Sequence, residues 1–163
     1  MRSSRHSGDW PLFSATVLLV LLCDLLSKYF VSTGLLAGEY LGGILRVTLV
    51  SNSGAAFGLF PGARGILIAV KLLALASILI LMGRGWKEES AFLTLSLALI
   101  FGGALGNLLD RFRASGEVID FLDVGLGGAR WYVFNIADAC ISVGALLLIL
   151  SLLRRPALQD GTA

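Results

Sequence analysis

The chain contains four apolar stretches that are each long enough to cross the hydrocarbon core of a bilayer, which is about 30 Å thick. They cover about residues 12–30, 65–83, 91–109 and 133–153. Because lipid cannot hydrogen-bond a peptide group, a stretch that crosses the core must form a helix. The composition agrees, since only 15% of the residues are charged, against about 25% in soluble domains. The sequence therefore predicts an α-helical integral membrane protein with four transmembrane helices, organised as one membrane domain over residues 1–163.

The first apolar stretch has a basic start, which is also typical of a cleaved secretory signal peptide. Its length and the lack of a small-x-small cleavage site favour an uncleaved span. Leu22, directly before Cys23, also spoils a lipoprotein processing box, which needs a small residue there. Cys23 and Cys140 both lie in apolar runs, so we expect small buried side chains rather than a disulfide.

Two segments outside the spans are typical of β-structure. Residues 44–50 form a short run rich in β-branched residues within a β-rich segment at about 38–61, and residues 118–124 repeat this character inside the loop 110–132. The glycine-rich run 52–58 does not favour a helix. We therefore expect a β-strand in each of these two segments.

The basic residues between the spans indicate the orientation. With four spans, both termini and the 83–90 loop share one face, which carries six basic residues against five on the other. The six lie in short segments, so the positive-inside rule favours cytoplasmic termini. The six are Arg2, Arg5, Arg84, Lys87, Arg154 and Arg155.

This alternation brings most polar residues of the spans to the outer face. Asp24 and Lys28 end the first span, Asp110 and Arg111 end the third, and Asn135 and Asp138 begin the fourth, with Asn52 and Asp120 in loops on the same side. An ionisable residue inside a membrane costs a few kcal/mol, so such residues are functional candidates. Lys71, which interrupts the second span, is a further intramembrane charge.

Helical spacing groups several of these residues. Gly103, Asn107 and Asp110 are three and four residues apart and share a helix face, as do Asn135, Asp138 and Ser142. Gly102 and Gly106 form a small-x-x-x-small pair that permits close helix approach. Asp24 and Lys28, four apart, are expected to form an ion pair.

Carboxylates are the main catalytic option. The chain has one histidine, His6, so histidine-based triads are excluded. Two acids that share a site cannot both ionise easily, so one keeps a proton while the other acts as a base toward water. Asp120, between Ile119 and Phe121, is favoured as the partner of Asp138. The adjacent Arg111 makes Asp110 a structural acid, while Glu117 and Asp123 are expected to be solvated.

The blocks 24–28, 52–58, 102–111, 118–121 and 134–138 resemble the bacterial lipoprotein signal peptidases, the signal peptidase II family. The resemblance implies four transmembrane helices with a small extracytoplasmic β-cradle, and an intramembrane aspartic endopeptidase with Asp120 and Asp138 as its dyad. Leu25 departs from the family, which usually has glutamine there, and one extra residue separates Arg111 from Asp120. The implied substrate-binding or supporting residues are Asp24, Lys28, Asn52, Gly54, Phe57, Gly103, Asn107, Asp110, Arg111 and Asn135.

The resemblance also implies the reaction and its location. The partner is a prolipoprotein whose signal peptide is removed before a diacylglyceryl-modified cysteine, and membrane lipids surround the enzyme. No cofactor or metal is implied. We expect a monomer in the bacterial inner membrane, with cytoplasmic termini and the active site at the outer face. Gly54 to Gly58 would form a flap, with Phe57 as an apolar contact, and Asn52 and Arg111 are candidates for binding substrate carbonyls.

Other classes of protein fit less well. A transporter would place its acids near the bilayer midplane. A presenilin-like protease would need Gly-x-Gly-Asp, whereas Gly125-Leu126-Gly127 is followed by Gly128. A Ser/Lys peptidase from Lys28 with Ser27 or Ser53 lacks a suitable spacing, and a purely structural membrane protein does not explain two acids flanked by asparagines. The net charge of +2 does not indicate a nucleic-acid partner.

Overall fold

The computed structural model describes residues 9–54, 63–84, 91–113 and 115–153. The expected fold, four long apolar helices with a small antiparallel sheet, is confirmed within these residues. The helices are α1 (Trp10–Ser32), α2 (Arg64–Arg84), α3 (Ala91–Arg111) and α4 (Ile136–Leu153), and the strands are β1 (Gly38–Tyr40), β2 (Leu45–Asn52), β3 (Val118–Leu126) and β4 (Ala129–Arg130), with a 3₁₀ turn η1 (Leu41–Gly43) between β1 and β2.

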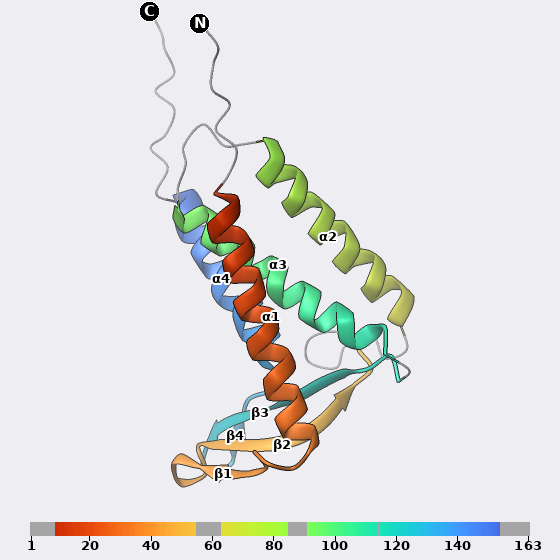
Figure 1. Cartoon of the computed structure of the whole chain (residues 1–163). Coiled ribbons are helices and arrows are strands. Elements are labelled where there is room, and N and C mark those ends of the chain that lie inside the picture. Colours follow the sequence, from red (N-terminus) through yellow and green to blue (C-terminus); the bar gives the residue numbers. More distant parts are fainter. Residues whose placement is uncertain (1–8, 55–62, 85–90, 114, 154–163) are drawn as a thin grey trace, which may run out of the picture.

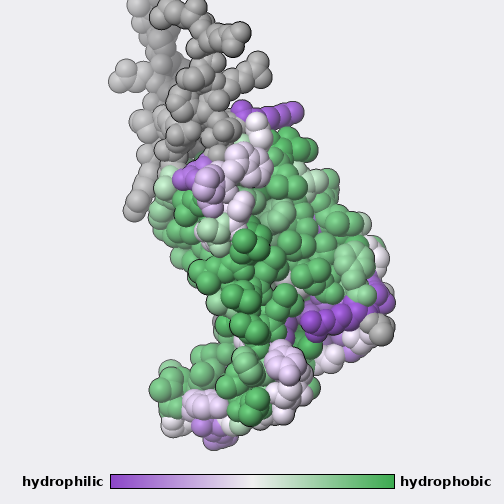
Figure 2. All heavy atoms as spheres, in the orientation of Figure 1, coloured by the Kyte–Doolittle hydropathy of each residue, from purple (hydrophilic) through white to green (hydrophobic). Residues whose placement is uncertain are grey.

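The four helices run side by side and the sheet lies at one end of the bundle (Figure 1). At that end α1 and α3 finish, and α2 and α4 begin. All four helices are long and apolar enough to cross a membrane, and a broad apolar surface covers the helical part of the face shown in Figure 2. The most apolar 18-residue window of α3 is 61% buried inside the protein, against at most 22% for the other three, so α3 is the central helix.

Glycines let the central helix approach its neighbours closely. A Cβ atom on Gly103 would lie 2.4 Å from the carbonyl oxygen of Ala137 in α4, and one on Gly102 would lie 2.9 Å from the Val20 side chain in α1. A Cβ atom on Gly106 would lie 2.7 Å from Oδ2 of Asp24, also in α1. A larger residue at Gly102 or Gly106 would push α1 and α3 apart, so the close approach expected for this pair of glycines is confirmed. The main core cluster then lies farther from the sheet and consists of Phe13, Val17, Ile78, Met82, Leu93, Leu97 and Ala98.

The sheet has the order β1-β2-β3-β4, and its pairs are antiparallel. Both predicted strands are present, as β2 and β3, and Asn52 at the end of β2 pairs with Val118 at the start of β3. The short edge strands β1 and β4 were not predicted, because two or three residues carry no detectable pattern. The sheet therefore brings the end of β2 next to Asp120.

Two sequence-based expectations need correction. Helix α4 begins at Ile136 rather than at 133, because Phe134 bridges to Leu122 of β3 and Asn135 caps the helix. Cys23 is exposed and Cys140 is half-buried, although both were expected to be buried, since the buried face of α1 carries Val20, Asp24 and Lys28 instead; both cysteines are free thiols.

Candidate active site

Asp120 lies on β3 and is almost fully buried, with 1% of its surface exposed. Its Oδ1 atom accepts a hydrogen bond from Nδ2 of Asn135 at 2.7 Å, and its Oδ2 atom accepts one from Nδ2 of Asn52 at 2.9 Å. The pKa of Asp120 is raised to about 6, mainly because burial disfavours the charged form and in part because of the nearby charge of Asp138, while the hydrogen bonds from Asn52 and Asn135 oppose this shift. The carboxyl therefore holds its proton to a much higher pH than an exposed aspartate.

Asp138 is fixed by the start of α4. The Oδ1 atom of Asn135 accepts a hydrogen bond from the backbone N–H of Asp138 at 2.8 Å, and Oδ2 of Asp138 accepts one from the N–H of Asn135 at 3.4 Å. This is a reciprocal capping box, in which each side chain satisfies a free N–H of the first helical turn. The helix terminus thus orients the carboxyl that it carries.

Two asparagines connect the two acids. Asn107 on α3 donates to Oδ1 of Asp138 at 2.7 Å, and its own Oδ1 accepts from Nδ2 of Asn135 at 3.0 Å. Since Asn135 also donates to Asp120, one hydrogen-bonded chain runs from Asp138 through both amides to Asp120. The structure therefore places the two acids in one network, although they come from a strand and a helix.

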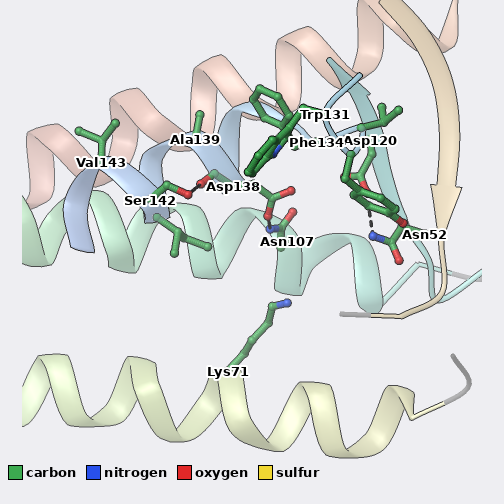
Figure 3. Close-up of a pocket in the computed structure, with 13 residues that line it drawn as sticks. Asn52, Lys71, Asn107, Asp120, Trp131, Phe134, Asp138, Ala139, Ser142 and Val143 are labelled. Carbon is green, nitrogen blue, oxygen red and sulfur yellow. Dashed lines mark hydrogen bonds between the residues drawn. The ribbon is translucent and has the colours of Figure 1, made fainter. Parts of the chain in front are cut away.

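The two acids face a common cavity of about 580 Å³ (Figure 3). Asp138, which is half-buried, and Asn107 lie at its centre, while Asp120 and Asn52 lie at its sheet end. The rest of the lining is mainly apolar and aromatic, from the segment before α4 and from α4 itself. These lining residues are Trp131, Tyr132, Val133, Phe134, Ala139, Ile141, Ser142 and Val143, and Lys71 joins them from α2. A peptide carbonyl in this cavity would have an acid and a base within reach.

Lys28 forms a buried charge cluster behind the cavity. Its Nζ atom lies 2.6 Å from Oδ2 of Asp24, 2.7 Å from Oδ2 of Asp110 and 3.3 Å from Oδ1 of Asn107. The contact between Lys28 and Asp110 is an ion pair without a hydrogen bond. Asp24 also accepts a hydrogen bond from the N–H of Ala137 at 3.0 Å, which ties α1 to the start of α4. The expected Asp24–Lys28 pair is confirmed.

Arg111 holds the end of β2 in place. Its guanidinium is 1% exposed and donates to the carbonyl oxygens of Ser53, Gly54 and Gly116. These bonds fix the backbone next to Asn52. The guanidinium of Arg111, which was a candidate for binding substrate carbonyls, is therefore bonded here to carbonyl oxygens of the protein itself. Phe57, the expected apolar contact of the flap, lies outside the described residues.

The sequence prediction missed several cavity residues. The four residues before Asn135 belong to no helix or long strand, so no spacing pointed to them, and the only signal for Lys71 was its charge inside a span. Asp123, which was expected to be solvated, is 14% exposed and accepts a hydrogen bond from Arg130 at 2.6 Å. Glu117 is partly exposed and accepts a hydrogen bond from the hydroxyl of Ser51 at the surface. Among the described residues, no group of three or more metal-ligating side chains comes together.

These features define a class, a helical membrane protein in which a buried and a half-buried carboxyl group, connected by hydrogen bonds, face a cavity at one end of the bundle. Comparison with known proteins then gives the family. The family model described as signal peptidase (SPase) II matches residues 16–154. The chain belongs to the signal peptidase II family, and it is accordingly a membrane protease of the type that removes signal peptides from prolipoproteins.

Individual relatives agree with this membership. A lipoprotein signal peptidase of Syntrophus aciditrophicus is 40% identical and the match covers 88% of this chain and 93% of that protein. One of Moorella thermoacetica is 42% identical, with 91% and 97% covered. A solved bacterial membrane enzyme superposes with a TM-score of 0.82 at 27% identity, with 98% of both chains covered. The likeness therefore extends over almost the whole chain.

Proposed function

We propose that the chain is an aspartic endopeptidase that cleaves prolipoproteins before a diacylglyceryl-modified cysteine, with Asp120 and Asp138 as its catalytic pair. The observation that carries this proposal is the hydrogen-bonded chain through Asn107 and Asn135, which links the two acids beside one cavity. Two connected carboxyl groups that share one proton supply the acid and the base that hydrolysis of an amide requires.

The environments of the two acids suggest which of them is the general acid and which is the general base. Asp120, whose pKa is raised to about 6, holds the proton, and half-buried Asp138 acts as the base. Asp138 takes a proton from a water molecule, whose oxygen attacks the scissile carbonyl carbon while Asp120 gives its proton to the carbonyl oxygen. When the C–N bond breaks, the proton on Asp138 passes to the leaving amine, and a hydroxyl proton of the tetrahedral intermediate returns to Asp120. The products are a carboxylic acid and an amine.

The proposed location rests on the basic residues expected at the cytoplasmic face and on the position of Asp120 in the sheet at one end of the bundle. We place the termini in the cytoplasm and the sheet end of the bundle at the outer face of the inner membrane, where the scissile bond of a lipid-anchored precursor would lie. The apolar cavity wall along α4, with Ala139, Ile141 and Val143, suits an acyl chain or an apolar signal helix. All contributors to the described network come from one chain, so we propose that a monomer surrounded by lipid is sufficient.

The purified protein is expected to cleave a precursor that carries diacylglycerol on its cysteine, and to leave the same precursor without lipid intact. A metal chelator should not change the rate, because carboxyl groups alone supply the acid and the base. Electrophoretic separation of precursor and product, with and without chelator, checks both points. Equal cleavage of the unlipidated precursor would contradict the proposed substrate, and loss of activity that added zinc restores would contradict the proposed chemistry.

A further inference from the structure

The described part of α2 carries one charged side chain away from its ends, that of Lys71. Lys71 lies seven residues after Arg64, so it is about 10 Å into the helix at a rise of about 1.5 Å per residue. The side chain lines the cavity and points across it toward Asn107 and Asp138 (Figure 3). A charge at this depth in a membrane-spanning helix is unfavourable, so its position calls for a compensating interaction.

No hydrogen bond or ion pair of the Lys71 ammonium group is found among the residues that the structure describes, and the side chain is half-buried. By contrast, Lys28 is compensated at short range by Asp24 and Asp110. Lysine side chains inside membranes often reach along their helix to the water interface. The side chain of Lys71 instead extends from α2 toward α3 and α4.

Among the described residues, four charged groups act electrostatically on the ammonium group of Lys71. Asp138 on α4 and Asp120 on β3 attract its ammonium group, whereas Arg111 on α3 and Lys28 on α1 repel it. Arg111 and Lys28 are engaged by the carbonyl oxygens and carboxylates described above. The negative charge across the cavity from Lys71 is therefore that of the acid pair.

On the basis of the proposed function, we propose that Lys71 is a positioning residue for the acid pair: its ammonium group stabilises the pair's negative charge across the cavity and sets the pH range in which the pair keeps one proton. A nearby cation favours the ionised form of a carboxyl group. Removal of the cation therefore makes both protons of the pair harder to remove, and the active, singly protonated state moves to higher pH.

The test compares the pH dependence of kcat/KM in the full-length protein and three variants. For Lys71→Met, which has a similar size and no charge, the pH profile should move to higher pH by about one unit, the effect of one unit charge across a partly polar gap. Lys71→Arg keeps the charge and should leave the profile in place. Arg84→Met is the matched control, because it removes an exposed cation from the same helix about 20 Å away, well beyond the Debye length.

A second readout does not depend on activity. Infrared spectroscopy follows the C=O stretch of protonated Asp120, identified by its loss in Asp120→Asn, and Lys71→Met should move its titration midpoint to higher pH. An unmoved midpoint or an unmoved pH profile overturns the role of Lys71, and so does a higher KM with an unmoved profile, which would make it a substrate contact. Full activity of Asp120→Asn would instead overturn the proposed function, so the two failures are distinguishable.

Discussion

Replacement of Asp120 by asparagine is expected to lower the rate of prolipoprotein cleavage by about 10³-fold or more, because it removes one member of the acid–base pair. Both oxygens of Asp120 accept hydrogen bonds from amide NH₂ groups, of Asn135 and Asn52. An asparagine amide would direct its own NH₂ at one of these donors, so the network would also be disturbed locally. Cleavage of a lipidated precursor, measured under single-turnover conditions, provides the rate.

Asp123→Asn is the matched control for this experiment. It makes the same chemical change three residues away on β3, but Asp123 is bonded to Arg130 and does not line the cavity. Loss of this partly exposed ion pair should cost about 1 kcal/mol or less and leave cleavage within a few-fold of wild type. Asp138→Asn should be as inactive as Asp120→Asn. Wild-type rates in either variant of the pair would rule out the proposed mechanism.

Replacement of Lys28 by methionine is expected to destabilise the protein by about 3–5 kcal/mol, because it leaves two carboxylates buried without their cation. Asp24 and Asp110 are both 0% exposed, and Lys28 lies within 2.7 Å of each. Asn107 would also lose its contact with Lys28, so the support of Asp138 should weaken. Reversible unfolding in mixed micelles, with increasing denaturing detergent, gives the free energy of unfolding.

Arg113→Met provides the comparison, since Arg113 also lies near Asp110, at 3.3 Å, but is 49% exposed. Exposed ion pairs contribute about 0–1 kcal/mol, so this variant should unfold almost like the wild type. If Lys28→Met changed the free energy of unfolding no more than Arg113→Met does, the buried cluster would not hold α1, α3 and α4 together. A triple variant with Asp24→Asn and Asp110→Asn should recover part of the loss.

The helices and the two long strands were predictable because their signals are strong over many residues. A run of about 19 apolar residues that crosses a membrane must form a helix, and the four runs correspond to α1, α2, α3 and α4. Helical spacing correctly predicted the Asp24–Lys28 pair and the close approach at Gly102. These are local features, which the order of residues determines directly.

The connections between elements were not predictable in the same way. Because Asp110 and Arg111 are adjacent in sequence, the charge of Asp110 was expected to be compensated by Arg111. In the structure Asp110 instead forms an ion pair with Lys28 of α1, and Arg111 donates a hydrogen bond to the carbonyl oxygen of Ser53, next to the end of β2. The position of Lys71 at the cavity of the two acids depends on how α2 packs against α3, and the spacing of residues within one helix does not determine that packing. The roles of Asn107 and Asn135 as a bridge likewise appear only when three elements meet.

The central claim is that Asp120 and Asp138 form one coupled pair, and titration of Asp120 with and without its neighbour's charge tests it most directly. By infrared spectroscopy, wild-type Asp120 should lose its proton with a midpoint near pH 6. In Asp138→Asn the midpoint should be lower, because the neighbouring carboxylate that opposes ionisation is gone. The same midpoint in both proteins would show that the two acids titrate independently and would contradict the account.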